Sequence, residues 1–116
     1  MGLAATKPTI ARMSSAKQIV DQAIAGNKVC VFSKTYCPYC TKAKRALQRF
    51  LKNFYVMELD GRNDGAAIQD YLLEITGGRS VPRVFVGGKF IGGGDDTDAL
   101  ARNGQLEKLL LEVGAI

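Results

Sequence analysis

Two cysteines separated by two residues are the strongest chemical signal in this sequence. Cys37 and Cys40 stand in the run Cys37-Pro38-Tyr39-Cys40, after an apolar stretch typical of a buried strand and at the start of a segment with helical periodicity. Pro38 suits the first turn of a helix, because an amide N–H at that position has no intrahelical partner. We therefore expect Cys37 to occupy the N-cap position, facing the free amides of the first turn.

The predicted position of Cys37 favours a nucleophilic thiolate. Free amides and the positive end of a helix dipole stabilise an anion, and a thiolate rather than a thiol is the nucleophile. Lys34 upstream and Lys42 and Arg45 downstream can add positive charge. Cys40 lies one helical turn further on, close enough to form a disulfide with Cys37. Because Cys40 begins the apolar stripe of the helix, we expect it to be the more buried thiol, so that Cys37 attacks and Cys40 resolves.

The inventory of residues excludes several other kinds of cysteine site. The chain has three cysteines and no histidine, which removes Cys–His proteases and zinc sites that use histidine. One chain cannot supply the four thiolates of an all-cysteine zinc site, so we expect no metal. The odd number of cysteines also argues against a disulfide framework. Cys30 lies in the apolar run Val29-Cys30-Val31-Phe32, where a free cysteine packs as a small hydrophobic side chain.

The composition indicates one soluble globular domain. Of the 116 residues, 47% are hydrophobic and 23% are charged, with a net charge of +5. No stretch reaches the roughly 20 apolar residues of a membrane helix, and no nucleic-acid-binding motif accompanies the basic residues. The densest basic group has the spacing of a solvated helix face. We therefore expect neither a membrane nor a nucleic acid as a partner. That group consists of Lys42, Lys44, Arg45 and Arg49.

The first thirteen residues lack a clear periodicity. They contain Lys7 and Arg12 but no acidic residue, which is compatible with a short transit peptide. The first six residues also fit the loose pattern for myristoylation at Gly2. A flexible tail explains the same composition without any targeting role. We predict a flexible tail over residues 1–13 and a single domain over residues 14–116.

Hydrophobic periodicity and turn residues predict the element order α-β-α-β-α-β-β-α-α. The first two strands flank one helix and therefore form a parallel, right-handed βαβ unit. The last two strands are joined by Gly87-Gly88, which suits a tight hairpin with positive φ at both turn positions. This order gives an α/β fold with a four-stranded mixed sheet and helices on both faces. The predicted strands cover residues 29–32, 54–59, 83–86 and 89–91.

Capping residues mark the starts of the predicted helices. Ser15 and Gln18 form a capping box for the first helix, and Asn63 or Asp64 caps the third. Asp95-Asp96 opens the fourth helix. Apolar spacing then predicts which side chains face the core. These are Ile19, Val20, Ala23 and Ile24; Cys40, Ala43, Leu47, Phe50 and Leu51; Ile68, Tyr71, Leu72 and Ile75; and Leu106, Leu109, Leu110 and Val113.

With these elements in place, the chain resembles the dithiol glutaredoxins of the thioredoxin-fold superfamily. The resemblance is to the Cys-Pro-Tyr-Cys type, class I, of plants and green algae, and it runs from about residue 14 to the C-terminus. It rests on four motifs that occur in the right order. These are SKTYCPYC at 33–40, IQDYL at 68–72, GRSVPRVF at 78–85 and FIGGGDD at 90–96.

The resemblance implies a thioredoxin-like fold and a glutathione-dependent thiol–disulfide oxidoreductase. Cys37 would attack a glutathione mixed disulfide, release the reduced thiol, and hold glutathione until a second glutathione restores the thiolate. Cys40 would serve the dithiol route on protein disulfides. The implied partners are glutathione, glutathionylated proteins and protein disulfides, and we expect a monomer. Glutaredoxin potentials of about −200 to −230 mV suit the cytosolic glutathione pool, so we expect a cytoplasmic protein, or a plastid or mitochondrial one if residues 1–13 are a targeting remnant.

The resemblance also assigns contacts along the glutathione tripeptide. Amides of the glycine-rich turn 92–94 and of the following helix N-terminus suit the carboxylate of the zwitterionic γ-glutamyl end, and Asp96 can accept its ammonium group. The thioredoxin fold implies a cis bond between Val81 and Pro82. The matched positions are Lys34, Gln69 and Arg79 for the glycyl carboxylate, Val81 and Pro82 for the cysteinyl unit, Tyr39 for the sulfur, and Gly93, Asp95 and Asp96 for the γ-glutamyl end.

Two residues depart from the family pattern, and two other functions stay open. Ser80 replaces the usual threonine but keeps the hydroxyl, whereas Gly94 replaces a bulkier residue and should loosen the γ-glutamyl end.

An iron–sulfur carrier would take Cys37 from each of two chains together with two glutathiones, but cluster-holding members generally lack a proline at the position of Pro38. A thioredoxin-like reductase would carry Cys-Gly-Pro-Cys after a tryptophan, and this chain has no tryptophan.

Overall fold

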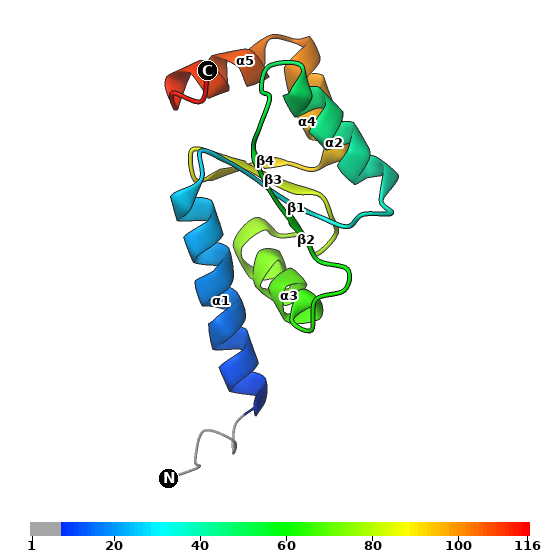
Figure 1. The fold of residues 1–116 in the computed structure, drawn as a ribbon, viewed down its shortest axis with the longest axis vertical. Coiled ribbons are helices and arrows are strands. Elements are labelled where there is room, and N and C mark those ends of the chain that lie inside the picture. The colour runs from blue at the N-terminus through cyan, green and yellow to red at the C-terminus, as the bar shows by residue number, and fades with distance from the viewer. Residues whose placement is uncertain (1–7) are drawn as a thin grey trace.

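The elements follow one another in the predicted order (Figure 1). The structure is a computed structural model that describes residues 8–116, with side chains from Ser15 onward. The helices are α1 (Pro8–Gly26), α2 (Pro38–Gln48), α3 (Gly65–Thr76), α4 (Gly94–Arg102) and α5 (Gln105–Glu112), and the strands are β1 (Val29–Ser33), β2 (Tyr55–Glu58), β3 (Arg83–Val86) and β4 (Lys89–Gly92).

The four strands form one mixed sheet in the order β2-β1-β3-β4. β1 and β2 are parallel, with Val31 opposite Val56, and β1 and β3 are antiparallel, with Cys30 opposite Phe85. β3 and β4 form the predicted hairpin, in which Gly87 and Gly88 have φ values of 59° and 82°. Both values lie in the left-handed region that glycine adopts without strain. The predicted mixed sheet is therefore confirmed.

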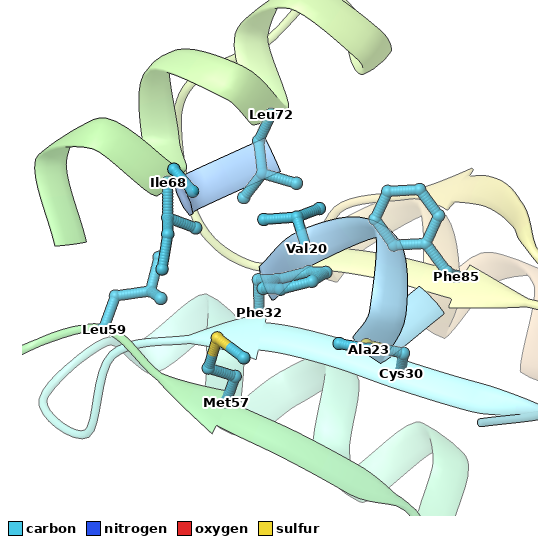
Figure 2. Close-up of a cluster of buried hydrophobic side chains, with 10 residues drawn as sticks. Val20, Ala23, Cys30, Phe32, Met57, Leu59, Ile68, Leu72 and Phe85 are labelled. Carbon is cyan, nitrogen blue, oxygen red and sulfur yellow. The ribbon is translucent and has the colours of Figure 1, made fainter. Parts of the chain in front are cut away.

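The sheet separates two layers of helices (Figure 1). All five residues of β1 are buried, as expected for a central strand, and alternate side chains of a strand point to opposite faces. Cys30 and Phe32 lie in the cluster under α1 and α3, which Figure 2 shows. Val29 and Val31 lie in the cluster under α2, α4 and α5. The helix α2, which begins directly after Cys37, thus packs on the face opposite α1 and α3.

The first helix begins earlier than predicted. α1 starts at Pro8, a residue that suits the first helical turn, and Ser15 lies within the helix rather than at its cap. Residues 8–13 contain neither glycine nor an internal proline, so nothing in them interrupts a helix. Residues 1–7 of the predicted tail lie outside the described residues, and the domain boundary at residue 14 stays a prediction. Within residues 8–116, none of the helices is long and apolar enough to cross a membrane.

α3 is rotated relative to the predicted apolar stripe. Ile68 and Leu72 are fully buried as predicted, but Ile75 is 41% exposed, so its predicted core position is wrong. Gln69 is buried instead. The buried face is therefore centred between Ile68 and Gln69, and Ile75 falls at its margin. Asp64 precedes the helix at the N-cap position, but its carboxylate pairs with the Arg62 guanidinium instead of capping the helix.

Candidate active site

Cys37 occupies the N-cap position of α2, as predicted. Its backbone is extended, with φ −90° and ψ 118°, and its sulfur accepts a hydrogen bond from the Cys40 amide at 3.3 Å. Pro38 begins the helix. Before it, the Cys37 amide donates to the Lys34 carbonyl at 3.2 Å, which closes a turn between β1 and α2. The sulfur therefore lies where the first-turn amides and the helix dipole stabilise a thiolate.

The two thiols of the motif differ sharply in exposure. Cys40 is 0% exposed, whereas Cys37 is only partly buried, and both are free thiols. Burial, together with the hydrogen bond to Cys37, raises the pKa of Cys40 to about 11. Cys40 therefore stays protonated near neutral pH, and only Cys37 can meet a substrate in solvent. The predicted difference in burial is confirmed.

Asp60 anchors the turn that carries the reactive thiol. It follows β2, and its carboxylate accepts a hydrogen bond from the Thr35 amide at 2.9 Å and another from the Thr35 hydroxyl. Both bonds hold the pKa of Asp60 below its usual value, and the bond from the Thr35 hydroxyl has the larger effect. The carboxyl ends of parallel strands meet at one edge of a sheet, so an acid after β2 lies beside the turn after β1. That position was the available sequence signal for Asp60.

The segment before β3 lies against the reactive thiol. The bond between Val81 and Pro82 is cis, as the resemblance to the thioredoxin fold implied. The Cys37 thiol donates to the Val81 carbonyl, with sulfur and oxygen 3.7 Å apart. Thus Val81 presents its main chain beside the sulfur, as a substrate backbone would require.

The predicted glycyl end is only partly assembled. Buried Gln69 donates through Nε2 to the Arg79 carbonyl at 2.9 Å, and the Arg79 guanidinium pairs with Asp70 at 2.8 Å. Lys34 lies on the β1–α2 turn, and within residues 15–116 no hydrogen bond joins it to Gln69 or Arg79. The structure therefore brings Gln69 and Arg79 together and leaves Lys34 on the neighbouring loop.

An open groove of about 410 Å³ runs from the first turn of α2 to the start of α4. Its walls come from three places that are distant in sequence: the first turn of α2, the segment that leads into β3, and the start of α4. The groove therefore contains the remaining residues predicted to contact glutathione. It is lined by Tyr39, Ser80, Val81, Pro82, Arg83, Gly93, Gly94, Asp95 and Asp96.

The two acids at the start of α4 have different partners. Asp96 accepts a hydrogen bond from the Gly93 amide at 3.2 Å and so stabilises the helix start. Asp95 forms an ion pair with Lys42 of α2 at 2.7 Å. Both carboxylates are exposed at the groove. Both can pair with a bound cation, and Asp95 would do so either alongside Lys42 or in place of it.

Gly94 is a point of close contact and not of slack. It is buried at the first position of α4, and a Cβ atom there would lie 2.5 Å from the Tyr39 carbonyl oxygen. The expectation that Gly94 loosens this end of the groove therefore does not match the structure. The missing side chain instead lets α4 approach the main chain of α2.

Comparisons with known proteins agree with this geometry. Residues 29–91 match the family model described as Glutaredoxin. A glutaredoxin from Ricinus communis is 50% identical over 90% of this chain and 98% of its own length. The crystal structure of oxidized glutaredoxin 2 from Chlamydomonas reinhardtii is 60% identical, with a TM-score of 0.88 over 90% of this chain and 98% of that one.

A third comparison adds a ligand-bound relative. The crystal structure of a buckwheat glutaredoxin–glutathione complex is 44% identical, with a TM-score of 0.87 over 94% of this chain and 99% of that one. The predicted thioredoxin-like fold is thereby confirmed. Sequence, fold and thiol geometry agree, and the chain belongs to the glutaredoxin family of oxidoreductases.

Proposed function

We propose that this protein is a dithiol glutaredoxin of the Cys-Pro-Tyr-Cys type that reduces glutathione mixed disulfides and protein disulfides with glutathione as the reductant. The observation that supports this most directly is the position of Cys37. Its sulfur lies at the N-cap of α2, 3.3 Å from the Cys40 amide and 3.7 Å from the Val81 carbonyl, beside an open groove. A partly exposed thiol at a helix start is suited to attack a disulfide.

The monothiol route needs only Cys37. Its thiolate attacks the glutathionyl sulfur of the substrate, the substrate thiolate leaves and takes a proton from water, and a Cys37–glutathione disulfide forms. A second glutathione thiolate then attacks the bound glutathionyl sulfur. Glutathione disulfide leaves, and the Cys37 thiolate is restored. The sum of the two steps is one glutathione consumed, one substrate thiol formed and one glutathione disulfide released.

Cys40 serves protein disulfides. After Cys37 has attacked a substrate disulfide, Cys40 gives up its proton and attacks the Cys37 sulfur, which expels the second substrate thiol and closes the Cys37–Cys40 disulfide. The amide of Cys40 already contacts the Cys37 sulfur, so the two residues are close. Two glutathiones then reduce this disulfide in turn. The pKa of Cys40, raised to about 11, keeps it protonated until that attack.

The charges in and beside the groove support glutathione as the ligand. The Arg79 guanidinium and the Lys34 ammonium suit the glycyl carboxylate. The Gln69 amide donates a hydrogen bond to the Arg79 carbonyl and so positions the Arg79 main chain. The Val81 main chain suits the cysteinyl unit, and Asp95 and Asp96 suit the γ-glutamyl ammonium group. The crystal structure of the buckwheat relative in complex with glutathione supports glutathione as the ligand. On binding, Arg79 and Asp95 would exchange Asp70 and Lys42 for ligand groups.

The remaining partners follow from this chemistry. The route uses glutathione as a co-substrate, no step in it requires a metal, and one chain contains both thiols, so we propose a monomer. Neither nucleic acid nor a membrane takes part. We propose the cytoplasm as the compartment, with a plastid or mitochondrion as the alternative, since relatives include a chloroplastic glutaredoxin from Oryza sativa subsp. japonica.

The test is reduction of a glutathionylated peptide, with formation of glutathione disulfide followed in time. We expect Cys37→Ser to abolish the reaction and Cys30→Ala, the matched control at a thiol outside the groove, to retain it. Full activity of Cys37→Ser would overturn the proposal. Faster reduction of the Cys37–Cys40 disulfide by a thioredoxin reductase than by glutathione would overturn the choice of glutathione as reductant.

A further inference from the structure

Arg83 is a charged residue of the groove to which the sequence motifs assign no role. It is the first residue of β3 and follows the cis Val81–Pro82 bond directly. Its Nε donates to the Ser80 carbonyl at 2.8 Å, and its Nη2 donates to the Ser80 hydroxyl at 3.0 Å. The planar fork of one guanidinium therefore grips both the main chain and the side chain of Ser80.

The guanidinium of Arg83 lies in a slot formed by Phe90 and Gly78 at the edge of the open groove. On one side, its central carbon is 5.1 Å from the centroid of the Phe90 ring, a cation–π distance. On the other side lies Gly78, where a Cβ atom would overlap the guanidinium nitrogens. Gly78 does not have a positive φ, so backbone conformation does not explain the glycine. The guanidinium of Arg83 occupies the space that a Cβ atom at Gly78 would take.

The segment held by Arg83 is the one that faces the predicted ligand. Three successive carbonyls in it accept hydrogen bonds from side chains: Arg79 from Gln69, Ser80 from Arg83, and Val81 from Cys37. Gln69 is a predicted glutathione contact, and Cys37 is the nucleophile. Arg83 holds the carbonyl between the two that they hold, and it donates these hydrogen bonds to Ser80 of the protein itself. Its contacts therefore fix the orientation of the Ser80–Val81 peptide unit and of the Ser80 side chain.

We infer that Arg83 is a positioning residue for glutathione recognition, which acts by fixing Ser80 so that the Val81 main chain and the Arg79 side chain face the tripeptide. This inference rests on the proposed function. Arg83 acts through Ser80 and forms no bond in the reaction. Loss of Arg83 should therefore weaken binding of the glutathionyl group. It should change little the rate at which the Cys37 thiolate attacks a disulfide that lacks the γ-glutamyl and glycyl parts.

The test compares two adducts of one peptide, a glutathione mixed disulfide and a cysteine mixed disulfide. The second-order rate constant for uptake of each adduct by the reduced enzyme is measured. We expect Arg83→Met to lower the constant for the glutathione adduct about tenfold, the equivalent of one charged hydrogen bond. The constant for the cysteine adduct should stay within about a factor of two, because that adduct lacks the γ-glutamyl and glycyl parts of glutathione.

The matched control is Arg102→Met. Arg102 also donates through Nε and Nη2 to a single residue, Asp98, but it lies at the far end of α4. We expect the rate constants of this variant for both adducts to equal those of the unmodified protein. A tenfold loss in the control would show that any lost two-point arginine contact has this effect, and it would overturn the inference.

Two further variants separate the fork from the charge. Arg83→Lys keeps a positive charge but cannot bond both Ser80 oxygens in one plane, so we expect it to lose as much as Arg83→Met. Full activity in Arg83→Lys would overturn the role of the fork. Ser80→Ala removes only the hydroxyl contact and leaves the slot intact, so it tests the inference even if Arg83→Met does not fold. Its effect and that of Arg83→Met should not add in the double variant.

The outcomes separate this inference from the proposed function. If the unmodified protein takes up both adducts equally, glutathione is not recognised and the proposed function fails. If the unmodified protein prefers the glutathione adduct and Arg83→Met keeps that preference, the proposed function stands and the inference about Arg83 fails. An equal loss on both adducts would show a general structural role and would also overturn the inference.

Discussion

Two thiols of this molecule are equally buried and yet have different surroundings. Cys30 lies in the middle of β1 and Cys40 in the first turn of α2, and both are 0% exposed. Burial alone raises the pKa of Cys30 to about 12. Burial and the hydrogen bond of its thiol to Cys37 raise the pKa of Cys40 to about 11. Burial therefore keeps both thiols protonated near neutral pH, and the two differ in that Cys40 lies beside the sulfur of Cys37.

The neighbours of Cys30 explain why it takes no part in thiol–disulfide exchange. Figure 2 shows it in an apolar cluster with Phe32, Met57 and Phe85. It faces α1 and α3, whereas the reactive motif begins α2 on the opposite side of the sheet. The comparison teaches that reactivity here comes from the helix start and from the paired sulfur. The experiments below are ordered from the largest expected effect to the smallest.

Removal of the Cys40 thiol should separate the two routes. We expect Cys40→Ser to abolish the reduction of protein disulfides, because no second thiol can release the substrate from Cys37. Reduction of a glutathione mixed disulfide should stay within about a factor of three, since that route uses Cys37 alone. Both activities are measured on the same preparation. Equal loss of the two would contradict a monothiol route.

Removal of the Cys30 thiol should affect stability instead. Cys30→Ser places a hydroxyl in an apolar cluster, and we expect it to lower the free energy of unfolding by about 1–3 kcal/mol. Cys30→Ala, which leaves a small cavity without a polar group, is the comparison variant. Urea denaturation measures both. Activity per folded molecule should not change, and a large loss of activity in Cys30→Ala would mean that Cys30 has a role in catalysis after all.

Alkaline pH should reveal the same burial. The pKa of Cys30 is about 12 in the folded protein against an ordinary value of 9.0. Between these two values the unfolded chain loses the thiol proton and the folded protein keeps it, so the free energy of unfolding falls as pH rises. From about pH 8 to about pH 10 the contribution of Cys30 should be a loss of about 1.4 kcal/mol. Cys30→Ala should lack this contribution, and a pH profile parallel to that of the unmodified protein would contradict it.

Much of the fold follows from local patterns. The element order, the hairpin at Gly87-Gly88 and the N-cap position of Cys37 all depend on residues that are adjacent in sequence, and all are confirmed. The predicted start of α1 is too late, because Ser15 and Gln18 match a capping box but lie inside a continuous helix that begins at Pro8. A cap signal is thus weaker than seven further residues that can remain helical.

The less predictable features depend on contacts between distant segments. Gln69 is buried and donates to the Arg79 carbonyl, whereas Ile75 is 41% exposed. Apolar periodicity cannot anticipate a buried amide. Arg83 likewise needs Gly78 and Phe90 to form its slot, and these residues meet only in the folded chain.

The close approach at Gly94 has a consequence for how the groove can change during evolution. The width of the groove at this end is set by main chain against main chain, because Gly94 places no side chain between α4 and the Tyr39 carbonyl. A wall made of side chains can be trimmed or extended one methyl group at a time. A Cβ atom at Gly94 would lie 2.5 Å from the Tyr39 carbonyl oxygen, so a side chain there requires α4 or the Tyr39 main chain to shift. A substitution at Gly94 therefore alters this end of the groove through the main chain as well as through the added side chain.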